Sequence, residues 1–305
     1  MTFKDAIEQF KLWRGFKVRP GTVKGYDMIL RQFCVYVRNC DIEQICLQDI
    51  TTWFALMQQL NWDYNSFIPK AMALRKFFEF YHKQNYRVVD PWLIPIPTKQ
   101  YKIPRVADEG NYQKLLDAIP INTNDPRHIR NLAIVSLLWD TGARNGEVLS
   151  LNTTDLVPDV TKAVIRTEKS RGRRPIREIF WTKTTDENLK RWLEKRESLK
   201  KKMNFDEPDA LFISICNAGV HGRSGKRFNL KGVGEMLRRY SNKAKIPNMN
   251  AHSFRHHMGH DIIKQGGSSA DVMNILGHAT VQSTTVYTMM TDRELEQRYR
   301  QFKGI

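Results

Sequence analysis

Six side chains beyond residue 140 have the types that reactions of phosphate esters require. They are Arg144, Lys169, His252, Arg255, His278 and Tyr287. Arginine binds phosphate oxygens through paired hydrogen bonds, and histidine and lysine can transfer protons. A tyrosine phenol can itself become a phosphate ester after nucleophilic attack. These residue types together predict a site for the chemistry of phosphate esters.

The spacing of the six residues strengthens this prediction. Arg144 ends a Thr-Gly-Ala-Arg segment, His252 and Arg255 form an H-x-x-R motif, and Leu-Gly-His ends at His278, nine residues before Tyr287. Each motif alone is common and has a structural alternative, such as a helix that ends at glycine beside a surface arginine. Their order and spacing within one chain favour an active site.

In this order and spacing, the motifs resemble those of the tyrosine recombinases, the integrase and Xer-like family of DNA strand-exchange enzymes. The resemblance covers about residues 105–300 through motifs, and the N-terminal part through its size and helical pattern. It implies a site-specific recombinase that cuts and rejoins double-stranded DNA through a 3′-phosphotyrosyl intermediate, with no metal or other cofactor. Integration, excision and dimer resolution are all compatible with it.

The resemblance also assigns roles to the phosphate-binding residues. Tyr287 is the nucleophile, and Arg144 and Arg255 stabilise the charge that develops on the non-bridging oxygens. Arginine suits this role because its charge does not change near neutral pH. Glu147 is in a position to orient Arg144.

The proton-transfer roles follow from the same resemblance. Lys169 is the general acid for the 5′-oxygen, although Lys183 is a rival for this role. His252 accepts the tyrosine proton or holds the phosphate, and His278 donates a hydrogen bond to a non-bridging oxygen. His252 and His256 are four residues apart on a predicted helix, but no acidic or cysteine ligand accompanies them, so we expect no metal site.

Composition points to a polyanionic partner. The formal net charge is +17, with lysine and arginine distributed along the chain, which favours nucleic acid as the partner. We expect no membrane association, because no long apolar run is present. The four cysteines lack zinc-binding spacing, and we interpret them as reduced thiols in a cytoplasmic protein.

The fold class expected for the chain is mainly α with a small antiparallel β-sheet. Apolar residues at helical intervals predict four helices within residues 2–90, and we assign residues 1–94 to an N-terminal helical DNA-binding domain. Three prolines mark residues 95–104 as a linker, and residues 105–305 form the catalytic domain. Basic residues of the N-terminal part and the linker that we expect to bind DNA are Lys70, Arg75, Lys76, Lys99 and Lys102.

The catalytic half alternates helical and extended patterns. A β-hairpin is predicted from residues 160–167 and 175–181, and its basic turn supplies the expected phosphate contacts Arg171, Arg173 and Arg174. Residues 211–214 read as a further short strand. Helices are predicted after Asp108 and at 130–139, 186–202, 230–243, 252–265, 269–276, 280–290 and 292–302.

Strand exchange between two duplexes needs four strand cuts, so the resemblance implies a homotetramer on two DNA sites with inverted-repeat half-sites, with accessory proteins as possible partners. Segment 292–302 is a candidate helix for docking on a neighbouring protomer, or for packing on its own domain. Two other functions remain open at this point. One is a type IB topoisomerase that relaxes DNA as a monomer, and the other is a DNA-binding regulator without catalysis.

Overall fold

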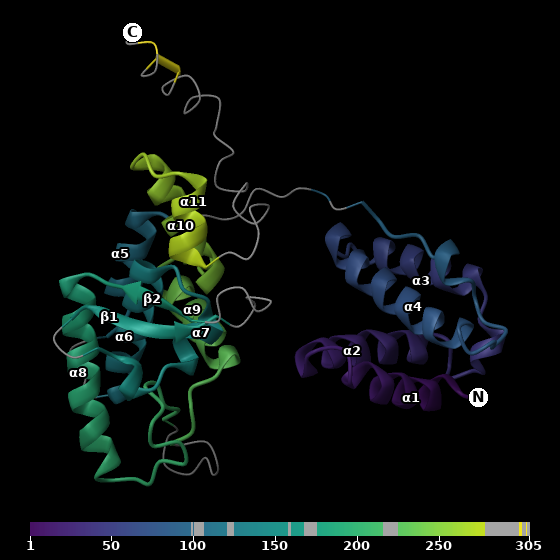
Figure 1. Cartoon of the computed structure of the whole chain (residues 1–305), viewed down its shortest axis with the longest axis horizontal. Helices are drawn as coiled ribbons and strands as arrows, with labels where there is room; N and C mark the ends of the chain where they lie inside the picture. The colour runs from purple at the N-terminus through teal and green to yellow at the C-terminus, as the bar shows by residue number, and fades with distance from the viewer. Residues whose placement is uncertain are drawn as a thin grey trace. The chain divides into compact units, whose positions relative to one another are not determined.

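The computed structural model describes residues 1–98, 100, 107–120, 125–157, 160–167, 176–215, 225–277, 299–300 and 303. The chain divides into two compact units, Met1–Ile103 and Pro104–Ile305. Helices dominate both units (Figure 1). No described helix is both long and apolar enough to span a membrane.

Four α-helices form the N-terminal unit, as the apolar periodicity predicted. They are α1 (Phe3–Gly15), α2 (Pro20–Tyr36), α3 (Leu47–Gln59) and α4 (Phe67–His82), joined by the short 3-10 helices η1 (Ile42–Gln44), η2 (Tyr64–Ser66) and η3 (Pro91–Leu93). Phenylalanine rings fill the core between α1, α2 and α4. The centroids of Phe3 and Phe77 lie 4.7 Å apart, and those of Phe3 and Phe33 lie 5.5 Å apart. Such ring pairs add to the stabilisation from apolar burial.

The basic residues of α4 are less exposed than we expected of a free DNA-binding rim. Lys70 is only 7 % exposed, and its ammonium lies 4.4 Å from the centre of the Trp62 ring. Burial lowers the pKa of Lys70. The guanidinium of Arg75 donates a hydrogen bond to the Ile94 carbonyl, and Lys76 pairs with Glu79 at 2.7 Å. The helix therefore directs these cations toward its own unit.

The C-terminal unit has seven α-helices and one two-stranded sheet among its described residues. The helices are α5 (Glu109–Asp117), α6 (Pro126–Thr141), α7 (Asn145–Ser150), α8 (Lys183–Lys200), α9 (Leu230–Lys243), α10 (Ala251–Lys264) and α11 (Ser269–Leu276), with the 3-10 helix η4 (Thr153–Asp155). Strands β1 (Lys162–Arg166) and β2 (Ile176–Phe180) are antiparallel, and Ile165 is opposite Arg177. The predicted fold class is confirmed.

Helix α6 is the central element of this unit. Its residues from Arg130 to Leu138 are all buried, and it packs against both α8 and α10. The helix begins at Pro126, earlier than predicted, because Asp125 accepts a hydrogen bond from the Arg127 amide and proline suits the first helical position. It ends at Gly142, as predicted, with that residue in the left-handed conformation.

Two predicted features of the C-terminal half differ from the structure or fall outside its described part. Residues 211–214 do not form a strand, and only Ile213 among them takes part in an isolated β-bridge, with Arg227. Leu211 donates to the Leu151 carbonyl, whereas Phe212 accepts from Phe228, so successive residues bond to different segments and no continuous ladder forms. The predicted helices at 280–290 and 292–302 lie outside the described residues, except for positions 299 and 300.

Candidate active site

The corner between α6 and α7 positions the first candidate arginine. Gly142 has a φ of +54°, and a Cβ atom there would lie 2.8 Å from Leu276 and 2.9 Å from Met258. Only glycine fits both the left-handed backbone and this close approach. The corner therefore brings the end of α6 directly against α10 and α11, immediately before Arg144.

Arg144 is bound to a buried carboxylate. Its backbone N–H donates to Glu147 Oε2 at 2.9 Å, and its guanidinium Nη1 donates to Oε1 at 2.8 Å. The Glu147 side chain is fully buried, whereas that of Arg144 is 19 % exposed. Glu147 thus orients Arg144, as predicted, and leaves part of the guanidinium open to a ligand.

Arg255 reaches the same corner from α10. Asn250 caps this helix by accepting from the amides of His252 and Ser253. The Arg255 side chain is 4 % exposed, and it donates to the Gly142 carbonyl at 2.9 Å and to the Leu276 carbonyl at 2.6 Å. The structure therefore brings together the corner before Arg144, Arg255 and the last residue of α11.

The histidines of α10 differ in their surroundings. His252 is exposed and lies one turn from Arg255 on the same helix. His256 is half-buried, and its pKa falls to about 4, first because of burial and then because of the nearby charges of His252, His260 and Arg255. His257 stacks on Trp139, with ring centroids 3.9 Å apart. In the part of the chain that the structure describes, no three potential metal ligands form a group.

Arg177 belongs to this cluster but was not predicted. From β2, its Nη2 donates to Glu147 Oε2 at 3.1 Å, and its Nη1 donates to the Ile275 carbonyl at 2.5 Å. Burial lowers its pKa, while the charge of Glu147 acts in the opposite direction. A signal was available in the sequence, because Arg177 is two residues before the buried Ile179 and so points to the same face of the strand.

The remaining predicted site residues lie outside the described residues. They are Lys99, Lys102, Lys169, Arg171, Arg173, Arg174, His278 and Tyr287. The residues directly before His278, up to Gly277, are nevertheless among those that the structure describes. Gly277 caps α11 with a φ of +67°, and a Cβ there would lie 2.8 Å from the Arg177 side chain. The segment before His278 is therefore fixed against the arginine cluster.

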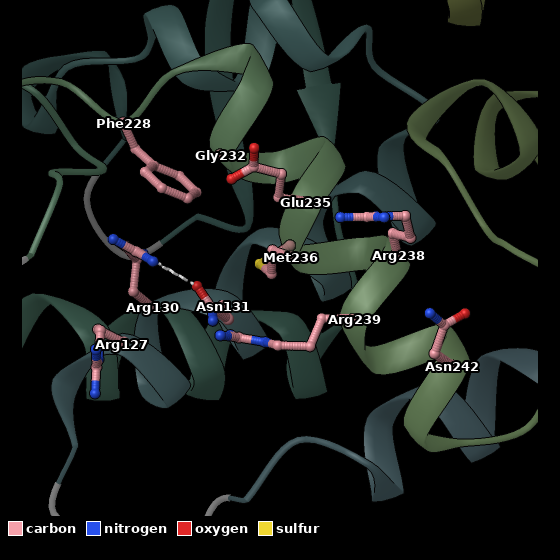
Figure 2. Close-up of a pocket in the computed structure, with 10 residues that line it drawn as sticks. All are labelled: Arg127, Arg130, Asn131, Phe228, Gly232, Glu235, Met236, Arg238, Arg239 and Asn242. Atoms are coloured by element: carbon pink, nitrogen blue, oxygen red, sulfur yellow. Dashed lines mark hydrogen bonds between the residues drawn. The ribbon is translucent and has the colours of Figure 1, made fainter.

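A second concentration of arginines lines a cavity of about 540 Å³ between α6 and α9 (Figure 2). Its guanidiniums come from Arg127, Arg130, Arg238 and Arg239. Arg130 is buried, donates to Asn131 and to the Ile213 carbonyl, and lies 3.8 Å from the Phe228 ring centre. Burial lowers its pKa to about 9. This four-arginine pocket was not predicted, because its members are distant in sequence.

The pocket and the catalytic candidates occupy opposite ends of α6. Arg130 lies in its first two turns, whereas Arg144 follows its last residue. Eleven helical steps from Arg130 to Thr141 correspond to about 17 Å. The pocket is consequently separate from the Arg144 cluster.

Comparison with known proteins agrees with the geometry. The model of the phage integrase family matches residues 105–294, which include all six candidate catalytic positions. The chain belongs to the phage integrase family. The prediction of a tyrosine recombinase, an enzyme that cleaves and rejoins DNA, is thereby confirmed.

Individual relatives of this integrase-family chain match nearly its whole length. Tyrosine recombinase XerD of Oceanobacillus iheyensis is 26% identical over 97% of this chain and 97% of its own. The integrase of transposon Tn1549 in complex with transposon right-end DNA covers 100% of both chains with a TM-score of 0.73 and 17% identity. The XerH recombinase on a palindromic difH substrate covers 92% of this chain and 80% of its own, with a TM-score of 0.66 and 19% identity.

We predict that Glu147→Gln lowers the free energy of unfolding by about 2–3 kcal/mol, because it leaves the buried Arg177 and the partly buried Arg144 without their carboxylate. Urea denaturation followed by circular dichroism measures this change. The control is Glu178→Gln on β2, because Glu178 and its partner Lys162 are both partly exposed, and this substitution should cost less than about 1 kcal/mol. Equal effects of the two substitutions would show that Glu147 does not organise the cluster.

Proposed function

We propose that this enzyme exchanges strands between two double-stranded DNA sites, with Tyr287 as the nucleophile. The phenol oxygen attacks the scissile phosphorus, the bond from phosphorus to the 5′-oxygen breaks, and a 3′-phosphotyrosyl link with a free 5′-hydroxyl results. The observation that carries this proposal is the convergence of Arg144 and Arg255 on one corner, beside the turn that leads to His278.

Arg144 and Arg255 stabilise the transition state. Attack adds negative charge to the non-bridging oxygens, and fixed guanidiniums stabilise it without reorganisation. Arg144 and Arg255 are held by a carboxylate and by main-chain carbonyls, so their positions are set before DNA binds. His278 adds a further donor to the phosphate.

Proton transfer completes the reaction. His252, exposed and one turn from Arg255, takes the proton of the Tyr287 phenol. Lys169, in the turn of the hairpin, gives a proton to the leaving 5′-oxygen, since an ammonium on a loop can reach it. Lys183 is the alternative acid, and it lies exposed at the first position of α8.

Both units bind the same duplex in this proposal, joined by linker 95–104. The expected contacts of the DNA backbone are Lys70, Arg75, Lys76, Lys99, Lys102, Arg171, Arg173 and Arg174, to which the four-arginine pocket is added. The net charge of +17 supports a large electrostatic contribution to binding. Lys70 must leave Trp62 to reach a phosphate, so its contribution is the smallest of these.

Each target site is a pair of inverted-repeat half-sites. Four protomers act on two of these sites together, and accessory proteins take part where the recombination system requires them. A symmetric target is supported by the similarity to XerH, whose DNA in the matching structure is palindromic. Recombined products from a two-site plasmid distinguish this activity from topoisomerase-like relaxation, which would change only the linking number.

The nucleophile assignment predicts that Tyr287→Phe abolishes covalent attachment to DNA and changes the Kd for DNA by no more than about threefold, because the ring is kept and only the attacking oxygen is lost. A suicide substrate with a nick beside the scissile phosphate traps the adduct for electrophoresis. Tyr299→Phe is the matched control and should form normal amounts of adduct. A covalent species in Tyr287→Phe would refute the assignment.

The two arginine groups should behave differently when replaced. Arg144→Ala and Arg255→Ala should each slow cleavage of bound DNA by about 10²–10³-fold, because they stabilise the transition state. Arg238→Ala and Arg239→Ala should weaken DNA binding and reduce its salt dependence, with the rate on bound DNA unchanged. Single-turnover cleavage at saturating protein separates rate from affinity. If all four variants lost only affinity, the cluster at Arg144 would not be catalytic.

The two-unit arrangement predicts the behaviour of fragments divided between Ile103 and Pro104. Each fragment should fold, because each unit has its own hydrophobic core. Each should bind DNA more weakly and with a shallower salt slope than the whole chain, since linked modules gain effective concentration and neutralise more phosphates. Fluorescence anisotropy over a salt series measures both. If the fragment starting at Pro104 bound DNA as tightly as the whole chain, the N-terminal unit would not contribute to DNA binding.

A further inference from the structure

We propose that Arg177 is a positioning residue for catalysis: it holds Glu147, and through it Arg144, against the turn that leads into His278. This inference rests on the proposed function, because it takes Arg144 and His278 as phosphate-binding groups. Arg177 lies on β2, away from every motif that identifies the site, and we infer that it acts through its neighbours without touching DNA.

The first support is the division of Glu147 between two arginines. Glu147 Oε2 accepts from the Arg144 backbone and from Arg177 Nη2, whereas Oε1 accepts from Arg144 Nη1. Arg177 therefore fixes the rotation of the carboxylate, with one oxygen directed at the Arg144 guanidinium. The Arg177 side chain is itself only 8 % exposed, so water competes little for this bond.

Because Glu147 is shared with Arg177, it also competes less with a phosphate for the donors of Arg144. A carboxylate paired with Arg144 alone would compete with the DNA phosphate for its donors. A second guanidinium on Glu147 reduces that competition, because the positive charge of Arg177 repels Arg144 and offsets part of its attraction to the carboxylate. In the described part of the chain, the Arg144 guanidinium donates only the bond to Glu147, and its other N–H groups remain available for a ligand.

The second support is the contact of Arg177 with the end of α11. Arg177 Nη1 donates to the Ile275 carbonyl, and Arg255 donates to the next carbonyl, Leu276. Helix C-terminal carbonyls lack partners within the helix and carry partial negative charge, so both cations are favourable there. Gly277 then turns directly beneath the Arg177 side chain. One guanidinium thus sets both the Arg144 carboxylate and the direction of the chain into His278.

The test compares Arg177→Gln with Arg196→Gln in the full chain. Arg196 is a matched control, because it is 1 % exposed, pairs with Glu197 and donates to the carbonyls of Ala210 and Pro208, but it does not contact Glu147. Covalent adduct formation on the nicked suicide substrate is measured in single turnover, normalised to the folded fraction. Arg177→Gln should slow adduct formation by about 10- to 100-fold, since small misplacement of a catalytic group has effects of this size. Arg196→Gln should keep the wild-type rate.

Two further variants separate positioning from general stability. Arg177→Lys keeps the charge but cannot bridge two acceptors in the fixed geometry of a guanidinium, so it should restore adduct formation only in part. Arg177→Gln combined with Glu147→Gln should lose less rate than the product of the two single losses, because both act on Arg144. Strictly multiplicative losses, or equal behaviour of Arg177→Gln and Arg196→Gln, would overturn the inference.

Hydrogen exchange gives a readout that does not depend on activity. The Gly277 amide donates to the Met273 carbonyl, and its exchange should accelerate in Arg177→Gln but not in Arg196→Gln. If the wild-type chain formed no adduct, the proposed function would fail, and the exchange rates would still decide whether Arg177 holds the turn. Unchanged exchange at Gly277 in Arg177→Gln would overturn the positioning role even if catalysis were normal in the wild type.

Discussion

The buried carboxylate of Glu147 is the constraint on which the catalytic unit depends. An ion removed from water is tolerated only when its charge and its hydrogen-bonding capacity are both satisfied. Glu147 meets this requirement with three donors, one from the backbone and two from guanidiniums that come from α7 and β2. Because Arg177 also donates to the Ile275 carbonyl of α11, the partners of this one carboxylate connect α7, β2 and α11. Arg255 adds α10 by donating to the next carbonyl, that of Leu276. The described cluster contains three guanidiniums and one carboxylate, an excess of positive charge that matches a phosphodiester under attack.

The histidines of α10 show how one helix separates structural from chemical side chains. His257 stacks on Trp139, which also stacks on Tyr112 at 3.9 Å. His256 is neutral near pH 7, because its pKa falls to about 4, first through burial and then through electrostatic interaction with His252, His260 and Arg255. A neutral His256 adds no charge to the site and limits repulsion of Arg255. His252, at the start of the helix, is exposed to solvent, which suits the proton-transfer role proposed for it.

Local sequence patterns predicted the elements well, and tertiary contacts account for the differences. Periodicity predicted the four N-terminal helices and the β-hairpin, because each depends mainly on its own apolar face. The same method failed at residues 211–214, whose hydrogen bonds go to two distant segments, and it could not show that Lys70 lies against Trp62. Arg144, Glu147 and Arg255 were predicted through motifs, whereas Arg177 and the four-arginine pocket were missed because their partners are set by folding and not by spacing.

Helix α6 sets the distance between the four-arginine pocket and the Arg144 cluster. A helix buried along most of its length cannot bend without disturbing the core, so the four-arginine pocket and the Arg144 cluster keep a fixed separation. At about 3.4 Å per base pair along a duplex strand, the estimated 17 Å corresponds to about five base pairs. If DNA binds at both places, as proposed, the two phosphates that it presents there are separated by about that distance. Phosphate contacts of this kind carry no base identity, but they set register. In the proposed complex, the rigid helix would therefore restrict which phosphate reaches Arg144 and Arg255.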